Sequence, residues 1–277
     1  MSTGARGIGH FLRARRDALQ PEDVGLVREP GRRVPGLRRE EVADLAGISA
    51  EYYLRLEQGR DHQPSGQVVA ALARALRLDG AGREYLSRLI TGFLSVPAAA
   101  GDTAGLGDHL AALVDRLGAA PAFVTDANKD VVISNPLARA LGGHALEPGQ
   151  NLLLELFAPQ VKLTTPQWEQ VARRAVATLR LFGDPDSARL QQVVGTLAVR
   201  DEDFRRWWAA YEVAATALRG SFSCTVDGFG RLELTYENLA VPGHPGHVVT
   251  LLRAQPGTAA HSALQVLSAR RRAPQLL

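Results

Sequence analysis

The stretch LRREEVADLAGISAEYYLRLEQGRDHQPS, residues 37–65, decides the fold of the first part of the chain. Apolar residues at helical spacing lie on both sides of Gly47-Ile48-Ser49. Glycine takes a left-handed turn without steric cost, isoleucine can plug the core beneath the turn, and serine can cap the helix that follows. The pattern therefore predicts two short helices joined at a tight corner.

Each of these helices is expected to have an inner and an outer face. The inner face of the first helix holds Val42, Ala43, Leu45 and Ala46, and that of the second holds Tyr53, Leu54 and Leu56. The outer face of the second helix holds Ala50, Glu51, Tyr52 and Arg55. A short helix presented in this way fits the major groove of DNA. Arg55 is the best candidate for reading guanine, because its guanidinium can bond O6 and N7 together, while Glu51 could accept from N4 of cytosine.

Charge is spread unevenly along the chain. Residues 1–39 contain nine arginines and four acidic residues, whereas residues 96–277 contain 17 basic and 17 acidic residues. The positive end could neutralise DNA phosphates. A small helical bundle with solvated surface arginines is the alternative interpretation. Helix lengths, turn chemistry and charge together favour DNA binding.

The length of 277 residues suits two domains. A linker rich in small residues, 96–107, separates a DNA-binding domain (1–95) from a second domain (108–277). Turn signals in the first domain delimit five helices, expected at about 8–19, 39–46, 50–58, 66–76 and 81–94.

The second domain is predicted to be α+β with an antiparallel sheet. A helix at about 107–117 precedes a hairpin of two strands, 121–126 and 129–134. Four helices follow, at about 136–142, 166–182, 187–198 and 201–216. Alternating runs at 222–226, 231–236 and 247–253 predict an antiparallel meander that closes the sheet.

An aromatic stripe is expected on the helix at 201–216. Phe204, Trp207, Trp208 and Tyr211 have the spacing of one helix face. The stripe either packs in the core or lines a ligand cavity, and the sequence leaves both alternatives open. If a pocket opens nearby, Asn135, Arg205 and Arg206 could hold a carboxylate or another polar head group.

Nothing in the sequence nominates an enzyme, a metal site or a cofactor. Phosphate-binding loops, nucleophile elbows and HExxH motifs are absent, and of the seven histidines only His244 and His247 lie close together, without a metal-like spacing to Cys or an acid. The single cysteine, Cys224, is expected to be a buried strand residue in a reducing compartment. Without a long apolar run or signal peptide, the protein is expected in the cytoplasm, away from membranes.

The signature LAGIS…YLRLEQGR…PS resembles the Cro/repressor-type helix-turn-helix of xenobiotic-response-element regulators. The resemblance implies that Ala50, Glu51 and Arg55 face base edges and that Glu57 pairs with an arginine of the first helix, for which Arg16 is the candidate. Contacts to the DNA backbone are expected from Ser49, Tyr52, Arg38, Arg39, Arg60 and Gln63, with Arg32 and Arg33 reaching out from the loop.

Over its whole length the chain resembles the MmyB-like (MltR-type) transcription regulators of actinobacteria and their relatives. The N-terminal run GHFLRARRDALQPEDVGL and the C-terminal pieces PAFVTD, SNPLARAL, FRRWWAAYEV and GRLELTYENL are similar to that family. The resemblance implies a PAS-like ligand-binding domain for fatty acids or similar small apolar molecules. The chain departs from the family at Ser134-Asn135, Tyr211 and Val226-Asp227, so the resemblance does not identify the ligand.

The sequence thus predicts a homodimeric regulator that binds a palindromic operator in double-stranded DNA and responds to a small apolar effector. In the alternative reading, the second domain is a ligand-free module for dimerisation or protein interaction.

Overall fold

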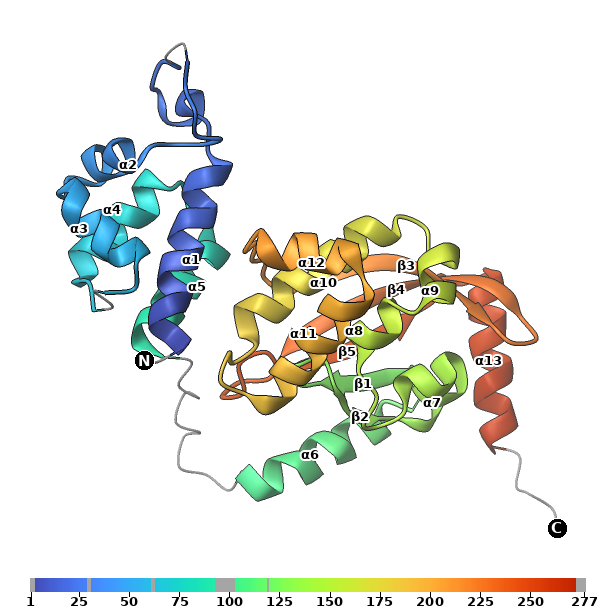
Figure 1. Ribbon diagram of the computed structural model, residues 1–277. Helices are drawn as coiled ribbons and strands as arrows, with labels where there is room; N and C mark the ends of the chain where they lie inside the picture. Colours follow the sequence, from blue (N-terminus) through green and yellow to red (C-terminus); the bar gives the residue numbers. More distant parts are fainter. Residues whose placement is uncertain (1–2, 29–30, 61–62, 93–102, 119, 273–277) are drawn as a thin grey trace.

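The computed structural model describes residues 3–28, 31–60, 63–92, 103–118 and 120–272, which form a helical domain and a mixed domain (Figure 1). The helical domain contains α1 (Thr3–Ala18), a short 3-10 turn (Pro21–Val24), α2 (Arg39–Ala46), α3 (Ala50–Glu57), α4 (Gly66–Ala75) and α5 (Gly80–Thr91). The five predicted helices are therefore confirmed.

The predicted corner between α2 and α3 is present in the structure. Gly47 ends α2 with φ of +65°, in the left-handed region. Ser49 caps α3, since its hydroxyl accepts a hydrogen bond from the amide of Tyr52 at 3.2 Å. Because the turn is so short, α3 leaves the corner in a direction fixed by α2.

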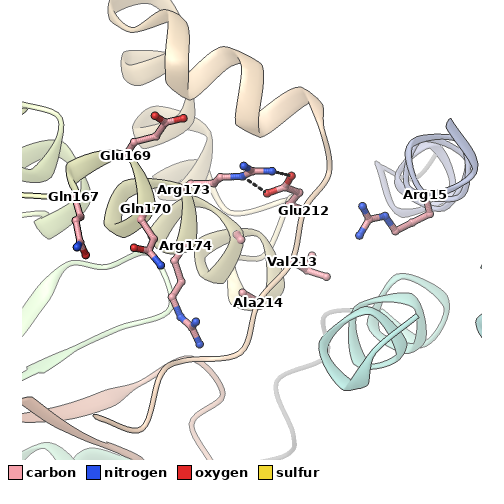
Figure 2. Close-up of a pocket in the computed structure, with 10 residues that line it drawn as sticks. Arg15, Gln167, Glu169, Gln170, Arg173, Arg174, Glu212, Val213 and Ala214 are labelled. Carbon is pink, nitrogen blue, oxygen red and sulfur yellow. Dashed lines mark hydrogen bonds and ion pairs between the residues drawn. The ribbon is translucent and has the colours of Figure 1, made fainter. Parts of the chain in front are cut away.

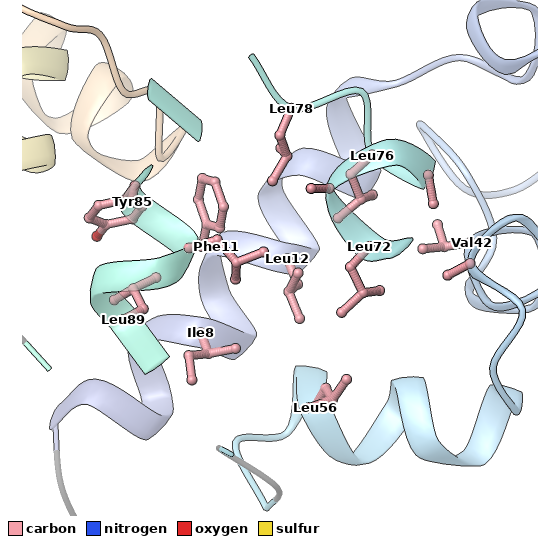
Figure 3. Packing of buried hydrophobic residues seen from close by; sticks show 14 of the residues in the cluster. Ile8, Phe11, Leu12, Val42, Leu56, Leu72, Leu76, Leu78, Tyr85 and Leu89 are labelled. Atoms are coloured by element: carbon pink, nitrogen blue, oxygen red, sulfur yellow. The ribbon is translucent and has the colours of Figure 1, made fainter. Parts of the chain in front are cut away.

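The core of the helical domain draws on all five helices. Ile8, Phe11 and Leu12 of α1 pack among Leu56 of α3 and Leu72 of α4 (Figure 3). Tyr53 and Leu56 are fully buried, as the sequence predicts for the inner face of α3. The prediction that Leu45 lies on the inner face of α2 is wrong, because Leu45 is 39% exposed.

The predicted linker coincides only in part with the structure. Residues 96–102 lie outside the described residues, and α6 (Thr103–Arg116) begins inside the expected linker. Residues 103–107, which the sequence assigns to the linker, form the first part of α6.

The mixed domain is built on a five-stranded antiparallel sheet, as predicted. The strands are β1 (Ala122–Thr125), β2 (Val131–Ser134), β3 (Arg219–Val226), β4 (Gly230–Ala240) and β5 (Val248–Arg253). Their order is β2-β1-β5-β4-β3, so the last strand of the chain pairs with the first and closes the sheet. Every residue of β1 is buried. Cys224 lies half-buried in β3, where burial raises the pKa of its thiol.

Helices connect β2 to β3 and cover the sheet (Figure 1). They are α7 (Pro136–Gly142), a 3-10 turn (Gly143–Leu146), α8 (Leu152–Leu156), α9 (Pro159–Thr164), α10 (Trp168–Phe182), α11 (Ala188–Arg200) and α12 (Glu202–Ala209), and α13 (Ala259–Arg272) follows β5. The sequence did not predict α8, α9 or α13. Among the described residues, no helix has the length and apolar character needed to cross a membrane.

The helix predicted at 201–216 is shorter than expected. It ends at Ala209, and Tyr211 adopts φ of +52°, which an α-helix does not accommodate. Tyr211 therefore leaves the face that Phe204 and Trp207 share.

Candidate nucleic-acid interface

Most of the outer face of α3 is exposed to solvent. Ala50, Glu51 and Arg55 are exposed, and Tyr52 is half-buried. The guanidinium of Arg55 lies 5.4 Å from the centre of the Tyr52 ring and 3.5 Å from the carboxylate of Glu51. Exposed pairs of this kind contribute about 0–1 kcal/mol, so the arginine can exchange Glu51 for another partner at little cost. α3 also lies on the side of the helical domain opposite the mixed domain (Figure 1).

Glu57 anchors the C-terminal end of α3. Its carboxylate is nearly inaccessible, with 3% of the side chain exposed, and it accepts from Nε of Arg16 at 2.6 Å and from Nε of Arg39 at 2.7 Å. Arg16 also donates to the carbonyl of Leu37 at 2.7 Å. The network ties α3 to α1 and to the start of α2, so the orientation of the outer face is held from behind.

Close packing of the backbones adds to this anchoring. A Cβ atom at Gly9 of α1 would lie 2.1 Å from the carbonyl oxygen of Glu57. Only glycine therefore lets α1 approach the end of α3 this closely.

The arginines and the glutamine expected to contact the DNA backbone fall into two groups. Arg33, Arg39, Arg60 and Gln63 are exposed, and Arg38 is half-buried. Arg32 was expected to reach out toward DNA from the loop. Instead its side chain is only 5% exposed and turns inward. It donates to Glu41 at 2.7 Å and to the carbonyl of Gly36 at 2.8 Å. The hydrogen bond from Arg32 lowers the pKa of the Glu41 carboxyl.

Two aromatic residues nominated for a ligand cavity belong to the core of the mixed domain. Phe204 is fully buried and Trp207 is 4% exposed. The ring of Phe204 meets that of Phe157 edge-on, with ring centres 5.6 Å apart. The ring centres of Trp207 and Trp168 are also 5.6 Å apart. Neighbouring rings fill the space around these two side chains, which favours the core-packing alternative for them.

The polar residues nominated beside them are also engaged. Asn135 is 1% exposed and caps α7: its side-chain oxygen accepts from the amides of Ala138 and Ala122, and its amide nitrogen donates to the carbonyls of Ala120 and Val114. This uses its full hydrogen-bonding capacity, so Asn135 is a structural residue.

Arg205 and Arg206 lie on the exposed side of α12. Arg205 donates to the carbonyl of Ala198 at 2.9 Å, and Arg206 pairs with Asp203 at 2.9 Å. Asn135, Arg205 and Arg206 are not among the residues that line the pocket between α1 and α10.

Trp208 and Tyr211 instead lie at the contact between the two domains. The guanidinium of Arg180, in the last turn of α10, lies 3.7 Å from the centre of the Trp208 ring and 4.0 Å from that of Tyr211. Tyr211 in turn stacks on His10 of α1, with ring centres 5.9 Å apart. Arg180 is only 5% exposed, and a buried cation stacked on two rings gains cation–π attraction.

The residues after Arg180 complete the contact. Leu181 is fully buried within the core cluster of the helical domain. The ring of Phe182 receives the guanidinium of Arg88 of α5, which lies 5.0 Å from the ring centre. The end of α10 is thus inserted into the face of the helical domain formed by α1 and α5.

An open depression of about 740 Å³ lies beside this contact, between α1 and α10 (Figure 2). Sequence reasoning did not predict it, because Arg15 and Glu212 come from different domains. One signal was available: Arg180 stands in an apolar helical run, VATLRLF, where an arginine implies a buried partner.

The short helix α3 follows a glycine corner, points outward and is surrounded by arginines, as in a helix-turn-helix DNA-binding domain. A family model of the helix-turn-helix domain matches residues 8–86. A model described as the MmyB-like transcription regulator ligand binding domain matches residues 106–267. That match covers more than half of the chain, so the protein belongs to the MmyB-like transcription regulators. No curated protein matches the chain. Among the described residues, no group of three or more His, Cys, Asp or Glu side chains could hold a metal ion.

Proposed function

We propose that α3 is a recognition helix that reads a specific operator sequence in the major groove. The observation that supports the proposal most directly is the contrast between its two sides: Ala50, Glu51 and Arg55 are exposed, whereas Glu57 is buried against Arg16. A helix held rigidly from behind presents its outer side chains in a fixed register to base edges.

Around α3 we propose contacts that position the duplex without reading its sequence. The exposed Arg33, Arg39 and Arg60 supply positive charge for phosphates. Ser49, Tyr52, Arg38 and Gln63 supply further donors at the edge of the same face. Arg32 is excluded from this set by its burial against Glu41.

Replacing Arg55 with alanine is expected to weaken binding to the operator by about 10- to 100-fold, since a bidentate contact with guanine is worth about 1–3 kcal/mol of discrimination. Weak, salt-sensitive binding to unrelated DNA should remain. Fluorescence anisotropy with an operator selected from genomic fragments measures both values. Arg200→Ala removes the same charge from an exposed position in the second domain and is the control. An equal loss on all sequences would make Arg55 a phosphate contact.

We propose further that the regulator binds as a homodimer to a palindrome. One small domain on one half-site rarely gives enough affinity, and paired half-sites one helical turn apart remedy this. Footprinting of the selected operator is expected to show two symmetric protected half-sites. A single asymmetric footprint would contradict the homodimer.

We also propose that the ligand-binding domain takes a small effector with an apolar body and that the regulator acts in the cytoplasm. Membership of the MmyB-like family supports a small-molecule ligand. Native mass spectrometry is expected to detect a co-purified small molecule. A clean protein mass from several expression hosts would instead support a ligand-free dimerisation or interaction module.

A further inference from the structure

Residues 210–217, which lie between α12 and β3 and are named the strap, lie against the helical domain. The ring of Tyr211 stacks on that of His10 of α1, with ring centres 5.9 Å apart. The guanidinium of Arg180 lies 4.0 Å from the centre of the Tyr211 ring. Val213 packs against the core of the helical domain. This docked form of the strap therefore connects the mixed domain to α1.

The docked strap is strained and leaves polar groups unpaired. Tyr211 adopts φ of +52° just after the end of α12, where glycine is the usual residue because it has no Cβ to clash. Of the amides at 212–217, only that of Ala214 donates to a backbone carbonyl within the described part of the chain, that of Ala177 at 3.3 Å. The hydroxyl of Thr216 is buried, and no described residue is its hydrogen-bond partner. Contacts with the helical domain must offset these costs.

The sequence of the strap favours a different conformation. It reads AYEVAATA, with four alanines and neither glycine nor proline, and alanine is the strongest helix former. If α12 continued to about residue 216, the amides at 212–216 would bond to carbonyls four residues earlier. The hydroxyl of Thr216 could then donate to the carbonyl of Glu212, as threonine does within helices. Tyr211 would return to the face of Phe204 and Trp207. A longer α12 would thus remove each defect of the docked strap.

We propose that the strap is a conformational switch between the docked form and a helical form in which α12 continues to about residue 216. In the helical form Tyr211 and Val213 leave the helical domain, so α1 loses these contacts. Because Arg16 of α1 holds Glu57 at the end of α3, release of α1 is expected to weaken operator binding. This link to the operator rests on the proposed function, whereas the two forms of the strap do not depend on it.

Replacing Tyr211 with alanine should shift the strap to the helical form, because the contacts to His10 and Arg180 are lost while the strain at this position remains. Far-UV circular dichroism of the full-length protein is expected to show a gain of helix. Exchange of the amides at 212–216 should slow at least about tenfold, as measured by hydrogen-exchange mass spectrometry. The control Tyr211→Phe keeps the ring and should behave like the wild type.

Ala215→Pro tests whether the gain of helix is an extension of α12. Ala215 is exposed and its amide donates to no backbone carbonyl among the described residues, so proline removes no such bond from the docked form. Within a continued helix, proline removes a hydrogen bond and clashes with the preceding turn. Combined with Tyr211→Ala, it should abolish the gain. The switch is overturned if Tyr211→Ala gains no helix or if the gain survives the proline.

Operator affinity tests the link to α3. Tyr211→Ala is expected to weaken it at least about fivefold, the lower end for coupling between sites, whereas Ala215→Pro alone should bind at least as tightly as the wild type. A gain of helix with unchanged operator affinity would overturn the link. If the wild type binds no operator, the proposed function fails, and the helix content still decides whether the strap switches. Urea unfolding shows which variants are folded, and His10→Ala, which removes the stacking partner of Tyr211, takes the place of Tyr211→Ala if that variant is unfolded.

Discussion

Replacing Arg16 with alanine is expected to lower the free energy of unfolding of the helical domain by about 3–5 kcal/mol, the cost of removing one partner from a buried ion pair. The carboxylate of Glu57 is 3% exposed and would lose its most buried partner, and the carbonyl of Leu37 would lose its donor as well. Hydrogen exchange of the amides in α1 and α3 measures this local stability. Operator binding should fall with it, because α3 loses its support.

Two controls distinguish the effect of breaking the Arg16–Glu57 ion pair from the general effect of removing a charge. Arg13→Ala removes an arginine whose side chain is 66% exposed and should change stability by less than about 1 kcal/mol. The double variant Arg16→Met with Glu57→Leu should recover much of the stability, because no uncompensated charge remains buried. A double variant as unstable as Arg16→Ala would show that the network contributes through packing and not through its charges.

Replacing Phe204 with alanine is expected to destabilise the mixed domain by about 3–5 kcal/mol, the usual cost of removing a fully buried aromatic ring. Phe204 is fully buried, and the rings of Phe157 and Trp208 lie 5.6 and 5.7 Å away, centre to centre. Urea unfolding followed by tryptophan fluorescence reports on this domain, because all three tryptophans of the chain lie in it.

The matched control for Phe204 lies two residues further along α12. Arg206→Ala removes an exposed side chain whose ion pairs are on the surface, and should cost about 0–1 kcal/mol. A cost for Phe204→Ala below about 1 kcal/mol would mean that the ring borders open space, and the cavity interpretation of the stripe would return.

The fold could be predicted from local signals where these agree with the tertiary contacts. Gly47 and Ser49 fix the corner between α2 and α3 through backbone chemistry that needs no distant partner. The meander of β3, β4 and β5 follows from alternation and tight turns. The helix α13 was missed although Ala260, Ala263 and Leu267 are buried at helical spacing, because small residues give a weak apolar signal.

The candidate sites were less predictable from the sequence, because the role of each side chain depends on which distant residue it contacts in the folded protein. Exposure of Ala50, Glu51 and Arg55 follows from the period of one helix. The inward turn of Arg32 depends on Glu41, and the burial of Asn135 depends on the carbonyl of Ala120, near the start of β1, which accepts from its amide nitrogen. A pattern of spacing could show that Phe204 and Trp207 share a face, but not that Phe157 and Trp168 already occupy the space beside it.

Leu181 links the packing of the two domains. It belongs to the ligand-binding half by sequence, yet it is fully buried in the hydrophobic core of the DNA-binding half. A chimaera that joins this DNA-binding half to an unrelated sensor would leave a hole where that leucine sits and expose the apolar surface around it. The two halves are therefore not interchangeable parts, and a DNA-binding half moved to another sensor would need a new side chain to fill the place of Leu181.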